Sequence, residues 1–247
     1  MAGERPSTLS APRMLEIWER GASWHPLDRA LMVVQAAGAG GPTEDPSEWT
    51  IGQRDRRLLE IRQDTFGDRI DSCAECPACQ SSLEFELSCG GLMELQGAPR
   101  PAEQTIEHEG APWVVRAPNS RDLAVAAVVS DLHNARAVLL ARCARPVNAD
   151  GSVIAEWTES QQAALGEALA DLDPLAEILI DLRCQLCGHT WQCLFDIAVL
   201  FWSEIRARSR RLLQDIDVLA RTYGWTESEI LRLSDRRRGL YVQMALS

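Results

Sequence analysis

Two cysteine pairs constrain this chain more than any other feature of its sequence. Cys76 and Cys79 flank two residues, Cys184 and Cys187 flank two more, and 104 residues separate the pairs. A two-residue spacer lets one tight turn present both sulfurs to a single ion, and zinc favours a tetrahedron of four thiolates. The sequence therefore predicts one structural Zn²⁺ held by these four cysteines, in a zinc ribbon that is split by a long insertion.

Other interpretations of the cysteines remain open. A thioredoxin-type C-x-x-C lies at a strand-to-helix turn, whereas both pairs here lead into apparent strands; unmetallated thiols are a further alternative. Cys73 or Cys89 could replace a ligand of the first pair, and His189 could replace Cys187. A catalytic zinc keeps one coordination position open. Four thiolates would close the site, so the metal is expected to be structural.

Alternating apolar and polar residues accompany both pairs. The segments 83–87, 177–184 and 191–196 alternate with the period of half-buried strands. A further hairpin is predicted over 105–116, turning at Glu109 and Gly110. Each cysteine pair is therefore expected at a strand end, which is where a zinc ribbon carries its ligands.

Helical periodicity occupies most of the remaining sequence. Helices are predicted over 12–20, 26–37, 52–65 and 120–143, the last broken near Ser130. Thr158 and Gln161 have capping-box spacing at the start of another, which runs to about Leu172. Apolar residues at steps of three and four predict one long helix over 195–223, stopped by Gly224, with two short helices after it.

These elements predict an α+β fold that is mainly helical. The expected parts are an N-terminal helical region (1–68), the two halves of the zinc ribbon (69–92 and 177–196), an inserted hairpin with helices (93–176), and a C-terminal helical tail (197–247). The N-terminus lacks the apolar core of a signal peptide and no apolar run approaches the length of a membrane span. A cytoplasmic protein with no membrane partner is expected.

Charge is unevenly distributed along the chain. The net charge is -11, and all 25 basic residues are arginine. The segment 201–247 carries nine arginines and six acidic residues, a net charge of +3. Solvated helix faces or a surface for a protein partner would both explain this. The candidate partner-binding residues are Arg206, Arg210, Trp225, Arg236 and Arg237.

Two further classes of function receive less support. Nucleic-acid binders interleave aromatic residues with their basic ones, and here the aromatics fall on or beside the apolar helix face. The sequence contains no HExxH, Walker A, GxGxxG or GxSxG motif. A non-enzymatic protein is therefore expected, with a zinc-ribbon nucleic-acid-binding accessory factor as the alternative.

Several segments resemble one protein family. The most characteristic are LARTYGWTESEILRLSDRRR (219–238), the preceding LFWSEI, and the second cysteine pair within RCQLCGHTW. IWERGASWHPLDRAL (17–31), IGQRDRRLLEIRQDTFG (51–67), CPACQSSLEFEL and WVVRAPNSRDL add to the likeness. In these segments the chain resembles the T-even-phage-type baseplate hub assembly chaperones of phage-tail-like contractile injection systems. Gln80 departs from the pattern of a zinc ribbon, in which glycine is commoner after the first pair.

The resemblance implies a non-enzymatic role in building a contractile tail. A protein of this family would hold or position a baseplate, hub or spike component during assembly. It would act either transiently as a chaperone or as a permanent subunit of the particle.

Overall fold

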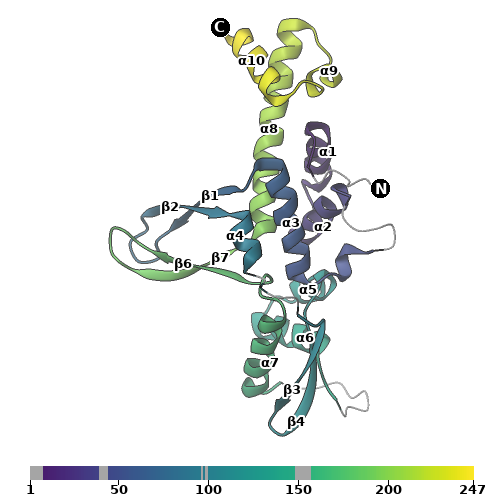
Figure 1. The fold of residues 1–247 in the computed structure, drawn as a ribbon, viewed down its shortest axis with the longest axis vertical. Coiled ribbons are helices and arrows are strands. Elements are labelled where there is room, and N and C mark those ends of the chain that lie inside the picture. Colours follow the sequence, from purple (N-terminus) through teal and green to yellow (C-terminus); the bar gives the residue numbers. More distant parts are fainter. Residues whose placement is uncertain (1–7, 39–43, 96, 98–99, 148–156) are drawn as a thin grey trace.

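The computed structural model describes residues 8–38, 44–95, 97, 100–147 and 157–247. It confirms the mainly helical α+β architecture, with small antiparallel sheets, a long C-terminal helix and two short helices after it (Figure 1). The described residues contain no helix that combines the length and the apolar character needed to cross a membrane.

A helical body forms the centre of the molecule. It consists of α1 (Ala11–Gly21), α2 (Pro26–Ala36), the 3₁₀ turn η1 (Pro46–Glu48), α3 (Ile51–Phe66) and the first half of α8 (Ile197–Tyr223). Thr50 and Gln53 form a capping box that begins α3. Val34, Leu59 and Ile205 are fully buried where these helices meet. The periodic apolar residues predicted from the sequence therefore become one core.

Two hairpins project from this body, and we call them the arm. β1 (Arg69–Glu75) pairs with β2 (Ser82–Ser88), and β6 (Ile178–Arg183) pairs with β7 (Thr190–Phe195), each as a separate two-stranded antiparallel sheet. Both leave the same side of the body, and their loops meet at the outer end (Figure 1). The core includes Ile70 and Ile178 at the bases of the hairpins. A two-stranded hairpin is marginally stable in water. The outer end of the arm is therefore expected to need an interaction between the two loops for its stability.

The helix α4 (Cys89–Glu94) follows β2 directly and was not predicted. Its six residues include Gly90 and Gly91, which weaken the helical signal in the sequence. Ser88 caps it, and Cys89 and Leu92 are buried in the core of the body. Tertiary packing therefore stabilises a segment whose local sequence does not favour a helix.

A distal unit lies at the end of the body that is opposite to the C-terminal helices (Figure 1). Its sheet has the order β3 (Glu103–His108), β4 (Ala111–Arg116) and β5 (Ala144–Pro146) and packs against α6 (Leu132–Cys143) and α7 (Glu159–Leu172). The helix α5 (Ser120–Ala127) packs against α6 and η1. It has its own core, to which Val115, Leu140 and Leu165 contribute. Glu109 and Gly110 both take positive φ, 52° and 76°, which is typical of a tight hairpin turn. The three-residue β5 was not predicted, because a strand so short has no periodicity.

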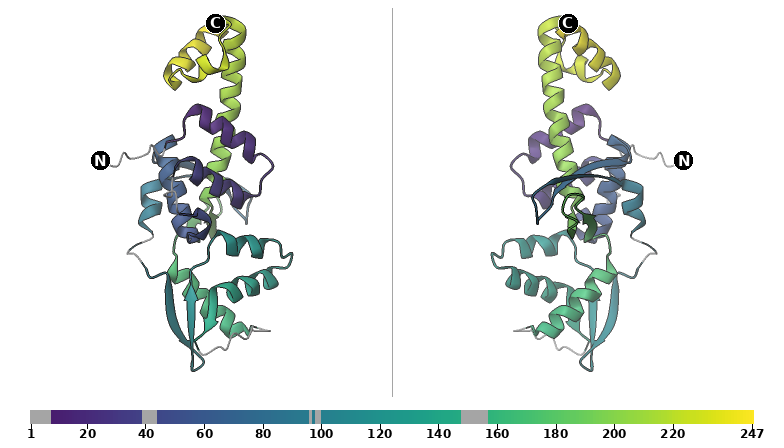
Figure 2. Two further views of the ribbon diagram at one scale, coloured as in Figure 1. Left: turned by 90° about the vertical axis from the view of Figure 1, so that its right-hand side faces the viewer. Right: turned by 90° about the vertical axis from the view of Figure 1, so that its left-hand side faces the viewer.

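The helix α8 connects the body to the C-terminal helices. Asp196 caps its start, and Gly224 ends it at a φ of 68°. Its 27 residues span about 40 Å, so its second half extends beyond the body. There it carries α9 (Glu227–Leu231) and α10 (Asp235–Leu246), as Figure 2 shows. We call residues 212–247 the C-terminal tip.

Candidate metal centre

The loops at the end of the arm are built in the same way. In the β1–β2 loop, the Cys76 amide donates to the Ser81 carbonyl at 2.9 Å and the Gln80 amide donates to the Cys76 carbonyl at 2.8 Å. In the β6–β7 loop, the Cys184 amide donates to the His189 carbonyl at 2.8 Å, and the Gly188 amide donates to the Cys184 carbonyl at 3.0 Å. Each loop thus presents its two cysteines from one compact turn.

The same backbone conformation explains an irregularity in the sequence. Gly188 has a φ of 75°, and Gln80, at the equivalent position of the first loop, has a φ of 60°. Glycine adopts this left-handed region without a steric penalty, whereas a residue with a Cβ does not. The turn geometry therefore tolerates Gln80 at a cost in backbone energy.

The four cysteines of the two pairs converge at the outer end of the arm. Their sulfur atoms all lie within 4.8 Å of one another. Cys76 Sγ is 3.7 Å from Cys187 Sγ, and Cys79 Sγ is 3.6 Å from Cys184 Sγ. Sulfurs bound at 2.3 Å in a tetrahedron lie about 3.8 Å apart, whereas a disulfide would need about 2.05 Å. The spacing therefore fits four thiolates around one ion.

Burial differs between the members of each pair. Cys76 and Cys184 are buried, whereas Cys79 and Cys187 are exposed, so one side of the site faces solvent. Ser81 closes another side: its Oγ lies 3.1 Å from Cys79 Sγ and 3.2 Å from Cys184 Sγ. Sequence reasoning missed Ser81, and the only local signal is its place two residues after Cys79.

Electrostatics in the cluster favour the binding of a cation. Hydrogen bonds from the Ser81 hydroxyl and from the backbone amides of Cys187 and Leu186 lower the pKa of Cys184 to about 6. The His189 amide lowers the pKa of Cys187, but partial loss of water around its sulfur and the hydrogen bonds with the neighbouring thiols outweigh that effect and raise the pKa to about 12. Four thiolates cannot share this volume without repulsion. A bound divalent cation would remove that repulsion.

The other cysteines lie outside this cluster. Cys73 is exposed on β1, and Cys89 is buried with its sulfur 3.6 Å from Arg62 Nη1. Cys143 is buried beside Asp122, 3.7 Å from its Oδ2. His189 stacks on Trp191 with ring centroids 6.1 Å apart. Among the described residues, the group that could hold a metal consists of Cys76, Cys79, Cys184 and Cys187.

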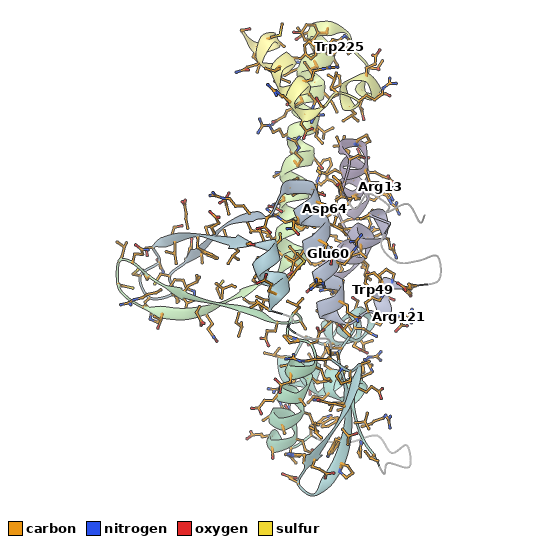
Figure 3. The ribbon with its side chains drawn as sticks, viewed as in Figure 1. Arg13, Trp49, Glu60, Asp64, Arg121 and Trp225 are labelled. Carbon is orange, nitrogen blue, oxygen red and sulfur yellow. The ribbon has the colours of Figure 1, made fainter. Side chains whose placement is uncertain are left out.

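The candidate partner-binding residues fall on two helices and on the loop between α8 and α9. Arg206 and Arg210 are exposed on α8, one turn apart, and Arg236 and Arg237 are exposed in the first turn of α10. Within the part of the chain that the structure describes, no carboxylate lies within ion-pair distance of these four guanidinium groups. Trp225 lies at the C-terminal tip (Figure 3). It is half-buried, because its ring stacks on Tyr223 at 4.8 Å and meets the edge of Tyr241 at 4.9 Å.

In comparisons with known proteins, no family model, curated protein or solved structure matches this chain. The geometry of the four cysteines therefore stands on its own as evidence about the site.

Proposed function

We propose that the four-cysteine cluster holds one structural Zn²⁺ that joins the two hairpins of the arm. The support is the spacing of the sulfurs, 3.6 and 3.7 Å across the cluster, which matches a tetrahedral thiolate site. Four protein ligands leave no coordination position for water or substrate. The ion would therefore supply stability and no catalysis at the metal, and we propose a non-enzymatic role for the protein.

We further propose that the protein is an assembly chaperone or a structural component for the baseplate or hub of a phage-tail-like contractile injection system. One observation carries this assignment: the resemblance of 219–238, together with 17–31, 51–67 and both cysteine pairs, to the baseplate hub assembly chaperones. The resembling segments include both metal-binding loops and much of the C-terminal tip. In this role the protein acts in the cytoplasm, and it can either leave or remain in the finished particle.

The exposed arginines support docking of a protein partner. Arg206, Arg210, Arg236 and Arg237 have no carboxylate within ion-pair distance among the described residues. Exposed, unpaired charges on rigid helices favour a partner with the opposite charge and speed its association. The partner is proposed to be a baseplate, hub or spike protein of the tail.

Co-expression with the neighbouring genes tests this function. The tagged chain, produced with the whole gene cluster, should co-purify with a hub, spike or baseplate protein identified by mass spectrometry. The matched control is the same tagged chain without those genes, to which the purified tail component is added afterwards. Failure to recover any tail component from cells that carry the intact cluster would contradict the assignment.

The second candidate is a zinc-ribbon nucleic-acid-binding accessory factor, and the same unpaired arginines are the observation that favours it. Phosphate contacts through arginine make binding fall steeply with salt concentration. DNA and RNA titrations between 50 and 200 mM salt separate the two functions. A flat response, or no binding at the lower concentration, would remove this candidate.

A further inference from the structure

The last helix, α10, has apolar side chains on two opposite sides. Its inner side faces α8 with the buried Arg238 and the half-buried Tyr241, Val242 and Ala245. Its outer side carries Leu240 and Met244, whose exposed fractions are 54% and 65%. A surface helix normally places its apolar residues on one side only. Packing within the chain therefore does not explain why Leu240 and Met244 are apolar.

The inner contacts hold α10 in a fixed position. Arg238 is 1% exposed, and its guanidinium pairs with Asp215 on α8 at 3.2 Å and with Asp235 in the first turn of α10. Tyr241 packs edge-on against Trp225 and Tyr223. The tip lies at the end of the longest axis of the molecule, beyond the helical body (Figure 3). The outer face of α10 is thus held in a fixed orientation before a partner binds.

Residues on this outer face have the spacing of a helix that binds in a groove. Arg237, Leu240 and Met244 stand at i, i+3 and i+7, the positions at which a helix places its anchors in an apolar groove. Methionine adapts its shape readily at binding surfaces. Arg236 and Arg237 are exposed at one end of the same face, with no carboxylate in ion-pair distance among the described residues.

We propose that the outer face of α10 is the docking element for the partner, and that it enters an apolar groove whose rim carries Asp or Glu. Charge complementarity selects this occupant, since the exposed arginines at one end of the apolar stripe favour a partner that places carboxylates opposite them. This inference rests on the proposed function, because it takes the partner to be a tail component. It adds which surface is used and what chemistry the partner presents there.

Site-specific photo-crosslinking tests the proposal. Full-length chain carrying benzoylphenylalanine at position 240 or 244 is produced with the neighbouring genes, irradiated and digested. The expected crosslinked peptide comes from a tail component and contains apolar residues next to Asp or Glu. Position 132 is the control, because Leu132 is 85% exposed on the distal unit. Crosslinks to a second copy of this chain, or crosslinks at 132 but not at 240 or 244, would overturn the proposal.

Affinity measurements with the purified complex provide the second arm. The double variant Leu240→Ala/Met244→Ala should bind the crosslinked component at least about tenfold more weakly, with an unchanged Tm because both side chains are exposed. Val128→Ala/Leu132→Ala removes apolar groups that are even more exposed, at 83% and 85%, and should bind normally. If the complex forms and the α10 variant binds with unchanged affinity, this inference fails while the proposed function stands. If no complex forms with the unaltered chain, both fail.

Discussion

At the residue scale, Gln80 is the place in the two cysteine loops where a residue other than glycine takes a positive φ. Its φ of 60° costs a residue with a Cβ about 1 kcal/mol or more. Gln80→Gly should therefore raise the free energy of unfolding of the zinc-loaded protein by about 0.5–1 kcal/mol, once the greater freedom of glycine in the unfolded chain is counted. Gly188→Ala, at the equivalent place with a φ of 75°, should lower it. Urea denaturation of both variants measures the pair, and equal shifts of the same sign would contradict the argument.

Also at the residue scale, Asp122 joins three elements of the distal unit. It is fully buried, and it pairs with Arg116 of β4 at 2.7 Å and with Arg142 of α6 at 2.8 Å. Burial alone would raise its pKa, but the hydrogen bond from Arg116, with those from the Asn119 amide and Arg142, lowers the pKa to about 2. Because both arginines are partly exposed, Asp122→Ala should cost about 2–3 kcal/mol at pH 7.

The pH dependence of this loss follows from the direction of the shift. A carboxyl whose folded-state pKa is depressed stabilises the fold above its unfolded pKa, near 3.9, and this contribution disappears as the pH falls towards 2. The difference between the unaltered protein and Asp122→Ala should therefore shrink over that window. Asp131→Ala, which removes an exposed cap of α6, should cost about 1 kcal/mol. Denaturation at several pH values measures the unfolding free energy of both variants. If the difference between the unaltered protein and Asp122→Ala stayed constant down to pH 2, the pairing of Asp122 with the two arginines would be refuted.

At the element scale, we expect the arm to depend on a bound metal ion, because each of its hairpins has only two strands. The unaltered protein should contain about one zinc per chain, and Cys76→Ser should lose it and expose the amides of β1, β2, β6 and β7 to hydrogen exchange. The matched control is Cys73→Ser, because Cys73 is an exposed cysteine of β1 outside the cluster. This variant should keep the zinc. Elemental analysis and hydrogen-exchange mass spectrometry give the readout. Folded protein purified without chelator and free of zinc would be the contrary result.

At the scale of the whole molecule, the described residues form two separate apolar cores, one in the helical body and one in the distal unit. Leu165 is fully buried in the distal core, so Leu165→Ala should cost about 2–5 kcal/mol. Hydrogen exchange should accelerate in β3–β5 and α5–α7, while the zinc content and the protection of the arm stay unchanged. The counterpart is Ile205→Ala, in the core of the body. Ile205→Ala should accelerate hydrogen exchange in α1–α3 and at the base of the arm. Equal loss of protection throughout the chain in both variants would mean that the cores unfold as one unit.

Much of the fold could be predicted because its signals are local. The alternation in 177–184 and 191–196 and the capping box of Thr158 and Gln161 depend on neighbours in the sequence, and the structure has strands and a helix there. The strand β5 and the helix α4 escaped prediction because contacts from distant segments stabilise them. The burial of Asp122 was equally invisible, since its partner Arg142 lies twenty residues away on another helix.

The sequence by itself determined the two cysteine pairs and the long helix, because a two-residue spacer and a helical period are properties of consecutive residues. Only the tertiary structure decided that the cysteine pairs meet at the end of a projecting arm, that Ser81 closes one side of the cluster, and that α10 turns Leu240 and Met244 outward. These features depend on how elements distant in the chain pack together. That packing is set by the summed burial of many side chains, which no short stretch of sequence contains.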